Sequence, residues 1–78
     1  MNQRDGNRDA LVLLLTEALV HLVHRKRLEI KYRDHALAGP WEDHRDCRLR
    51  PDFILIYRLP GNDTLQLVRL GFHSELGL

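Results

Sequence analysis

The stretch HRDCRLRPDFILIY, residues 44–57, decides the fold of this chain. Its first half alternates with a period of two, which is typical of a strand whose two faces meet different surroundings. One face carries Arg45, Cys47 and Leu49, and the other carries His44, Asp46, Arg48 and Arg50. Pro51 ends this strand because it has no backbone donor for a ladder. Residues 53–57 are apolar on both faces, as expected of a central strand.

A turn and a further strand follow this stretch. Residues 60–63, Pro-Gly-Asn-Asp, have turn chemistry, and residues 64–70 return as a partner strand. Gly71 ends that strand and leaves residues 71–78 as a tail. We therefore predict a three-stranded antiparallel meander over residues 44–70.

Upstream of the meander, the apolar residues change to a helical period. We predict a helix over residues 8–25, after an irregular lead-in at residues 1–7. One broad face of this helix carries Leu11, Leu15, Ala18 and Leu22. Leu13 and Val20 fall among polar positions, so a second apolar strip is left for another layer or a partner to cover.

A connector, residues 28–43, joins the helix to the meander, and Gly39-Pro40 interrupts regular structure within it. The chain is thus predicted to be a single α+β domain, residues 1–78, with one main helix packed on a small sheet. The helix is expected to meet one face of the central strand, which is either Phe53, Leu55 and Tyr57 or Ile54 and Ile56. A partner or the connector would then cover the other face.

Composition excludes several classes of protein. The 78 residues hold 12 Lys and Arg against 11 Asp and Glu, a balance that argues against binding nucleic acid by bulk charge. A single cysteine, Cys47, excludes an internal disulfide framework, and its alternation indicates a packed position instead of a reactive thiol. The apolar stretch 10–23 is too short and too polar for a membrane span, so we predict a cytoplasmic protein.

Histidine is frequent, with 5 residues in the chain, but a metal site is not favoured. His21 and His24 are three apart on the predicted helix and could join Cys47 around zinc, yet nothing supplies a fourth ligand. The sequence favours solvated histidines at the helix end. We therefore predict no metal.

A second polar set has the chemistry of phosphodiester cleavage. Such a reaction needs a base, an acid and a cation that stabilises charge on phosphorus. The connector, the strand ends and the tail supply candidates in His35, Arg48, Asp52, Arg69 and His73. Spacing alone leaves open that these residues are merely solvated.

Separated motifs keep a fixed order along residues 32–76. They are YRDHAL at 32–37, RDC at 45–47, RPDFILIYR at 50–58 and RLGFHSEL at 69–76, with Gly39 and Trp41 between the first two. In order and spacing they resemble the YafQ branch of the RelE superfamily. These are the mRNA-interferase toxins of bacterial type II toxin–antitoxin pairs.

The resemblance implies a sheet with the site on one face, and cleavage of mRNA on the ribosome without metal or another cofactor. The ribose 2′-OH would attack the adjacent phosphate. The implied catalytic residues are His35, Asp52, Arg69 and His73. His73 is expected to be the acid for the leaving 5′-oxygen, and Arg69 to stabilise the charge on phosphorus. The expected substrate contacts are Arg48, Arg50 and Trp41.

The chain also departs from the family pattern. Arg48 stands where the motif often has histidine, and Gly77 stands where an aromatic residue is common. Family members begin with a strand and a first helix, whereas this chain starts near the second helix. We therefore expect either a longer native product or a decayed member of the family.

Two functions remain open at this stage. One is a ribosome-dependent endoribonuclease, and the other is an inactive or truncated toxin-like module that binds antitoxin or acts as a co-repressor. Expected partners are a cognate antitoxin of ribbon-helix-helix type, the ribosome and mRNA, and operator DNA through the antitoxin. A second copy could also pack on the 10–23 helix. A generic RNA-binding domain is disfavoured because Phe53 and Tyr57 are expected in the core, which leaves few aromatics for stacking.

Overall fold

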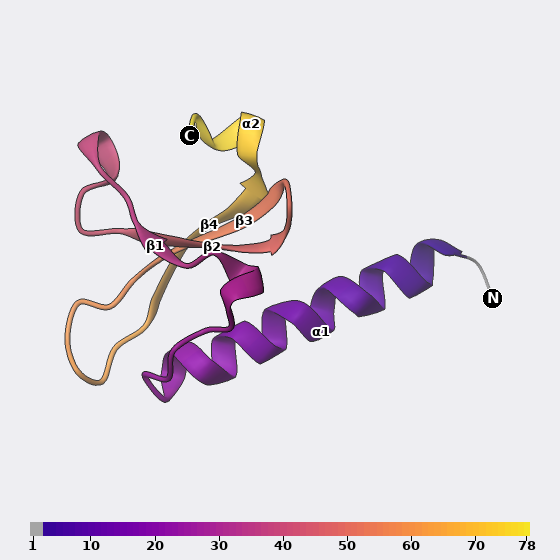
Figure 1. Cartoon of the computed structure of the whole chain (residues 1–78), viewed down its shortest axis with the longest axis horizontal. Coiled ribbons are helices and arrows are strands. Elements are labelled where there is room, and N and C mark those ends of the chain that lie inside the picture. Colours follow the sequence, from indigo (N-terminus) through magenta and orange to yellow (C-terminus); the bar gives the residue numbers. More distant parts are fainter. Residues whose placement is uncertain (1–2) are drawn as a thin grey trace.

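The structure, a computed structural model, describes residues 3–78, with side chains from residue 8 onward. Its elements in chain order are α1 (Gln3–Val23), η1 (Ile30–Tyr32), β1 (His35–Ala36), η2 (Gly39–Trp41), β2 (Arg45–Arg50), β3 (Phe53–Arg58), β4 (Gln66–Phe72) and α2 (His73–Leu76). Figure 1 shows the long helix α1 on one side of the sheet and α2 on the other. The predicted α+β class is confirmed.

The sheet has four antiparallel strands in the order β1-β2-β3-β4, one more than predicted. The extra strand, β1, comes from the segment that was predicted to be only a connector. Its two residues, His35 and Ala36, pair with Asp46 and Arg45 of β2. The same segment holds the 3-10 turns η1 and η2. A strand this short has no periodicity of its own, so only the pairing with β2 defines it.

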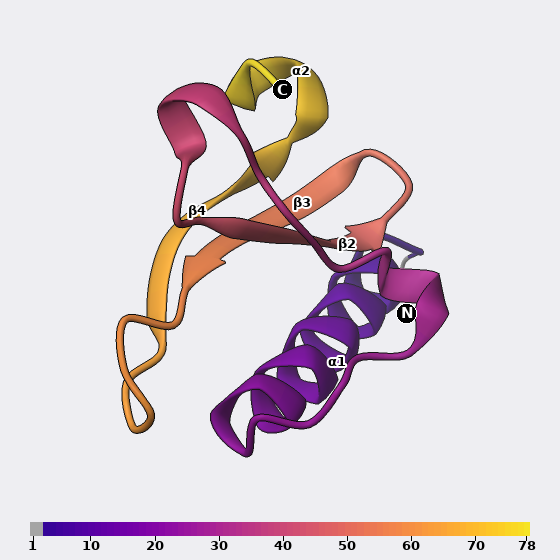
Figure 2. The same cartoon turned by 60° about the vertical axis from the view of Figure 1, so that its left-hand side comes forward.

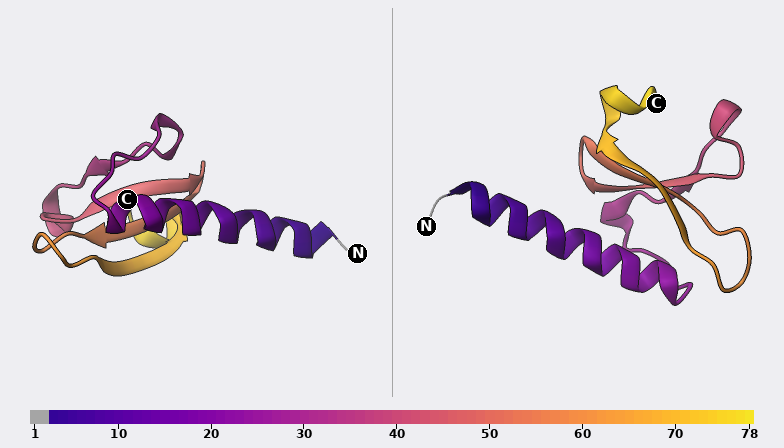
Figure 3. Two further views of the ribbon diagram at one scale, coloured as in Figure 1. Left: turned by 90° about the horizontal axis from the view of Figure 1, so that it is seen from below. Right: turned by 180° about the vertical axis from the view of Figure 1, so that it is seen from behind.

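Helix α1 starts earlier and ends sooner than the predicted span of residues 8–25. Residues 3–7 continue the helix instead of forming a lead-in, although Gly6 and Asn7 have low helix propensity. Residues 1–2 of the predicted lead-in lie outside the described residues. The helix ends at Val23, and Arg25 then adopts a left-handed φ of 56°. Both views in Figure 3 show the N-terminal part of α1 extending past the sheet.

The larger core lies between α1 and the sheet. Its buried members are Ala18, Leu22, Leu28, Tyr32, Cys47, Leu49, Leu55 and Tyr57. Phe53 packs against this cluster as well, so the first of the two predicted strand faces is the one that meets α1. The burial of Cys47 confirms its predicted packed position.

A smaller core covers the opposite face of β3. Ile54, Ile56 and Leu76 are buried there, and four partly buried residues pack on them: Leu37, Trp41, Val68 and Leu78. Figures 1 and 2 show that η2 and α2 both lie on this side of the sheet. The cover thus comes from the connector, one of the two predicted alternatives, together with the C-terminal segment.

The predicted tail, residues 71–78, is more ordered than the sequence indicated. Strand β4 continues to Phe72, and α2 follows directly. Gly71 allows this close approach, because a Cβ there would lie 3.3 Å from Glu75 Oε1 and 3.7 Å from a methyl group of Leu76. The backbone N–H of Phe72 donates to Glu75 Oε1 at 2.9 Å, which closes the first turn of α2.

Several large apolar side chains remain exposed on the side of the sheet that faces α1. On α1 the most exposed is Leu13, at 70%, and on β4 they are Leu67, Leu70 and Phe72. The second apolar strip expected from Leu13 and Val20 is therefore present. Within residues 3–78, neither helix combines the length and the apolar character that crossing a membrane requires.

Candidate active site

The face of the sheet away from α1 carries most of the candidate residues. Residues opposite each other on antiparallel strands point to the same face. The register pairs His35 with Asp46, Asp46 with Ile56, and Ile56 with Arg69, so these four form one row. Arg48, opposite Ile54, begins the next row on that face. Three sequence candidates, His35, Arg48 and Arg69, therefore share this face.

Asp46 lies at the centre of this group, although it was not among the residues predicted to take part in the chemistry. The residue is almost fully buried, at 3% exposure. Burial raises the pKa of Asp46 above its ordinary value, while the charges of His35, Arg48 and His73 act to lower it. The structure thus brings three predicted site residues within electrostatic reach of one buried acid. Its position on the polar face between His44 and Arg48 was the signal that the sequence offered.

Two oxygen atoms lie close to the same ring nitrogen of His35, Nδ1. Its Nδ1 lies 2.8 Å from the carbonyl oxygen of Arg33 and 3.0 Å from Asp46 Oδ1. Asp46 Oδ1 forms no hydrogen bond with good geometry, so its contact with His35 is electrostatic and becomes an ion pair when the ring is protonated. The carbonyl acceptor and the negative charge of Asp46 both favour a proton on Nδ1. In neutral His35 the lone pair is then on Nε2, and the side chain is half exposed.

His73 is fixed by the turn between β2 and β3. It is the first residue of α2, and its backbone N–H donates to the carbonyl oxygen of Asp52 at 2.8 Å. Within residues 8–78, the carboxylate of Asp52 forms no hydrogen bond or ion pair. The structure therefore connects Asp52 to the site through its backbone.

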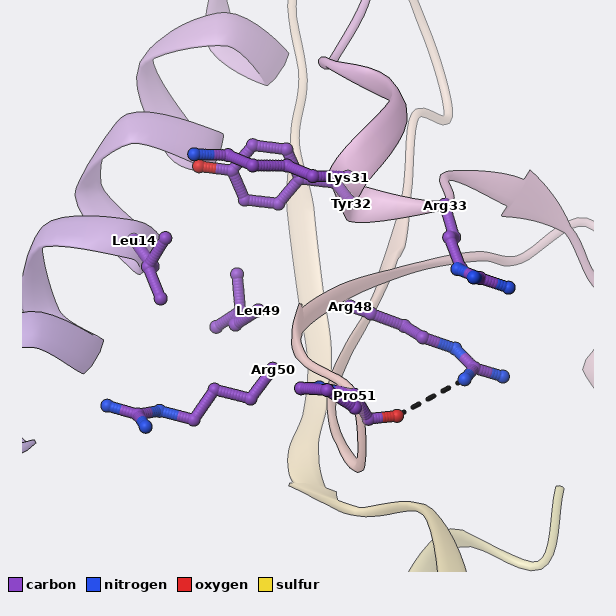
Figure 4. A pocket seen from close by; sticks show the side chains of 8 residues that line it. All are labelled: Leu14, Lys31, Tyr32, Arg33, Arg48, Leu49, Arg50 and Pro51. Carbon is purple, nitrogen blue, oxygen red and sulfur yellow. Dashed lines mark hydrogen bonds between the residues drawn. The ribbon is translucent and has the colours of Figure 1, made fainter.

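Arg50 lies apart from Arg48, which corrects the expectation from strict alternation. A register shift between Arg48 and Arg50 places Arg50 opposite Phe53, which packs toward α1. Figure 4 shows the Arg50 side chain extending toward α1 and the Arg48 side chain extending the other way. The Arg48 guanidinium donates to the carbonyl oxygen of Pro51 at 3.2 Å. The alternation of residues 44–50 continues without interruption, so it could not predict this bulge.

Trp41 forms a partial cover over the smaller core and so lies on the site face. Its ring meets His44 edge-on, with 5.3 Å between the ring centroids.

The two helix histidines and the cysteine lie elsewhere. The Nδ1 atoms of His21 and His24 each lie 2.8 Å from a carbonyl oxygen one turn earlier in α1. Cys47 is fully buried in the larger core, and burial raises the pKa of its thiol to about 12. In the part of the chain that the structure describes, no three His, Cys, Asp or Glu side chains gather as metal ligands do.

Comparison with known proteins identifies related sequences and structures. The model of the family described as "Bacterial toxin of type II toxin-antitoxin system, YafQ" matches residues 2–77. A YafQ protein of Haemophilus influenzae is 40% identical over 60 residues, which are 73% of this chain and 59% of that protein. The mRNA interferase toxin YafQ of Escherichia coli K12 is 44% identical over 45 residues, which are 58% of this chain and 48% of that protein. The chain thus spans about half the length of these curated relatives.

A solved structure supports the same grouping. In the crystal structure of the E. coli DinJ-YafQ toxin-antitoxin complex, one chain superposes on this protein with a TM-score of 0.73 and 35% identity. The match covers 83% of this chain and 71% of that one.

Proposed function

The chain belongs to the YafQ family of bacterial toxins from type II toxin–antitoxin systems, and we propose that it is an mRNA interferase that cuts mRNA on the ribosome. The name of its E. coli relative supports this activity. The observation that carries the proposal is the buried Asp46, whose Oδ1 lies 3.0 Å from His35 Nδ1 and whose pKa the charges of Arg48 and His73 act to lower. This set can supply the base, the acid and the cation that cleavage by the ribose 2′-OH requires.

His35 is proposed as the base. With the proton on Nδ1, beside the Arg33 carbonyl and the charge of Asp46, the lone pair is on Nε2 of a half-exposed side chain and can take the proton of the 2′-OH. Asp46 acts as a positioning residue, since it fixes the ring and stabilises the imidazolium that forms. The resulting 2′-oxygen attacks the adjacent phosphorus, and the bond from phosphorus to the 5′-oxygen breaks.

His73 is proposed as the acid that protonates the leaving 5′-oxygen. Its backbone bond to the carbonyl of Asp52 fixes where α2 begins and so where the ring lies. This gives Asp52 a positioning role as well. Arg69 and Arg48 would stabilise the negative charge that builds on the phosphate oxygens, since a guanidinium matches phosphate geometry. Trp41 would offer the exposed part of its ring to a base.

We further propose that a cognate antitoxin of ribbon-helix-helix type restrains the toxin in the cytoplasm and connects it to operator DNA. The E. coli complex of DinJ with YafQ supports an antitoxin partner.

The test uses growth arrest in bacteria and cleavage of mRNA in a reconstituted translation reaction. We expect His73→Ala to lower the cleavage rate by about 10²–10⁴-fold. Arg69→Ala should lower it by about 10²–10³-fold. His21→Ala and His24→Ala are matched controls and should leave both readouts unchanged, because their rings bond only within α1.

Retained cleavage in His73→Ala, or its loss in His21→Ala, would contradict the proposed site. Absence of cleavage by the wild-type chain, combined with tight antitoxin binding, would favour the second candidate, an inactive co-repressor module. Arg48 motivates that alternative, because an arginine is a poor general base at neutral pH.

A further inference from the structure

A hollow of about 500 Å³ at the edge of β2 is lined by four cationic side chains. Lys31 and Arg33 come from the segment around η1, and Arg48 and Arg50 come from the end of β2 (Figure 4). None of the described residues that line it is acidic. Its volume lies within the range of small-molecule sites, about 300–1,000 Å³.

The hollow exists because β1 is short. That strand covers only Arg45 and Asp46 of β2, so within residues 3–78 the last residues of β2 pair with β3 on one edge and with no strand on the other. The register shift then directs Arg48 and Arg50 to different sides of the opening (Figure 4). Arg33 borders the hollow in a left-handed conformation, with φ of 48°, which non-glycine residues adopt at a cost. The arginine positions are therefore set by the backbone.

The positive charges of this hollow are only partly neutralised. Lys31 lies 3.7 Å from Glu17 and 3.9 Å from Glu29. Within residues 8–78, neither Arg33 nor Arg48 has a carboxylate within ion-pair distance. The Nε of Arg48 is buried and has no hydrogen-bond partner there. The guanidinium groups of Arg33 and Arg48 at a concave site favour an oxyanion, and phosphate is the one whose geometry they match.

Arg48 also links the hollow to the candidate active site. Arg48 and Asp46 lie two residues apart on the same face of β2, opposite Ile54 and Ile56, so Arg48 borders both the hollow and the His35–Asp46 pair. Tyr32, the aromatic residue of the hollow, is fully buried and offers no face for stacking a base. The hollow would therefore recognise the RNA backbone and not its sequence.

We infer that this hollow holds a phosphodiester of the single-stranded RNA substrate beside the bond that is cut. The inference rests on the proposed function, because it names a second contact for the same substrate. Its role is to fix the strand in register with His35.

The experiment measures binding of a fluorescein-labelled single-stranded RNA by anisotropy as a function of salt. All variants are made in His73→Ala, which keeps the RNA intact. Arg33→Gln combined with Arg50→Gln should weaken binding. It should also make the slope of log affinity against log salt shallower by about 0.7 for each lost phosphate contact. The matched control, Lys26→Gln with Arg27→Gln, removes the same charge from exposed positions after α1 and should leave the slope unchanged.

Two further arms and a check of folding make the result decisive. Arg33→Lys with Arg50→Lys keeps the charge and should retain the wild-type slope, and circular dichroism checks that each variant is folded. Double-stranded RNA of equal length tests whether the hollow instead serves helical ribosomal RNA. A larger loss for the duplex, or equal losses in the two glutamine pairs, would overturn the inference.

Failure of the inference and failure of the proposed function are distinguishable. Cleavage by the wild type together with an unchanged salt slope in the Arg33 and Arg50 pair overturns the inference alone. A shallower slope with no cleavage by the wild type supports the hollow and contradicts the proposed function.

Discussion

The two faces of the sheet differ in what their buried residues do. The face toward α1 buries the larger cluster, and its polar groups are paired, as when the hydroxyl of Tyr57 donates to Asp34 and Arg45 donates to the same carboxylate at 3.1 Å. The opposite face buries three apolar residues and also a carboxylate, Asp46, one of whose oxygens lacks a hydrogen bond. The face toward α1 thus stabilises the fold, while the opposite face is less stabilising because it buries the carboxylate of Asp46 among charged groups.

Truncation of neighbouring residues on β3 should give the largest difference between the faces. Leu55→Ala removes a buried side chain from the larger core and should lower the free energy of unfolding by about 2–5 kcal/mol. Ile56→Ala should cost less, because the connector and the C-terminal segment over that face can settle into the space. Urea denaturation measures the free energy of unfolding of both variants, and the comparison holds when their m-values are equal. A larger cost for Ile56→Ala would show that the candidate site face is the better packed one.

Cysteine labelling tests how accessible the core on the α1 face is to solvent. The thiol of Cys47 is fully buried with its pKa raised to about 12, so little thiolate forms at pH 8. We expect labelling by a maleimide to be more than about 100-fold slower in the native protein than in urea. The unfolded chain is the internal control. Equal rates would mean that the larger core opens readily.

The substitution Asp46→Asn should separate stability from activity on the other face. Burial raises the folded-state pKa of Asp46 above its ordinary 3.8. The folded state therefore binds the proton more tightly, and Asp46 lowers the free energy of unfolding as pH rises from 3.8 through its folded pKa. The amide does not titrate, so the variant should lose this decline and be more stable than the wild type at pH 7.

The same variant should cleave RNA about 10–100-fold more slowly, because an amide orients His35 less well than a carboxylate. Thermal melts between pH 4 and pH 8 and the cleavage assay measure the two effects. Asp34→Asn is the comparison on the α1 side: it weakens the bonds to Tyr57 and Arg45 and should lower stability. A stabilised Asp46→Asn with full activity would remove Asp46 from the proposed mechanism.

The sequence by itself determined the class of fold and the identity of the central strand. The change of period at residue 44 and the apolar run 53–57 are patterns within single segments. They can be recognised without knowing which strands pair with them. The motif order along residues 32–76 also sufficed to identify the family, and the match over residues 2–77 confirms it. Most of the candidate residues were named by the same motifs.

Only the tertiary structure decided which groups meet. Strand β1 exists because His35 and Ala36 find partners on β2, and the separation of Arg48 from Arg50 comes from one extra residue opposite β3. The central position of Asp46 likewise depends on distant segments, namely its cross-strand neighbour on β1 and the charge of His73 at the start of α2. Pairing, register and burial are relations between distant segments, and the periodicity of one segment contains no information about its partner.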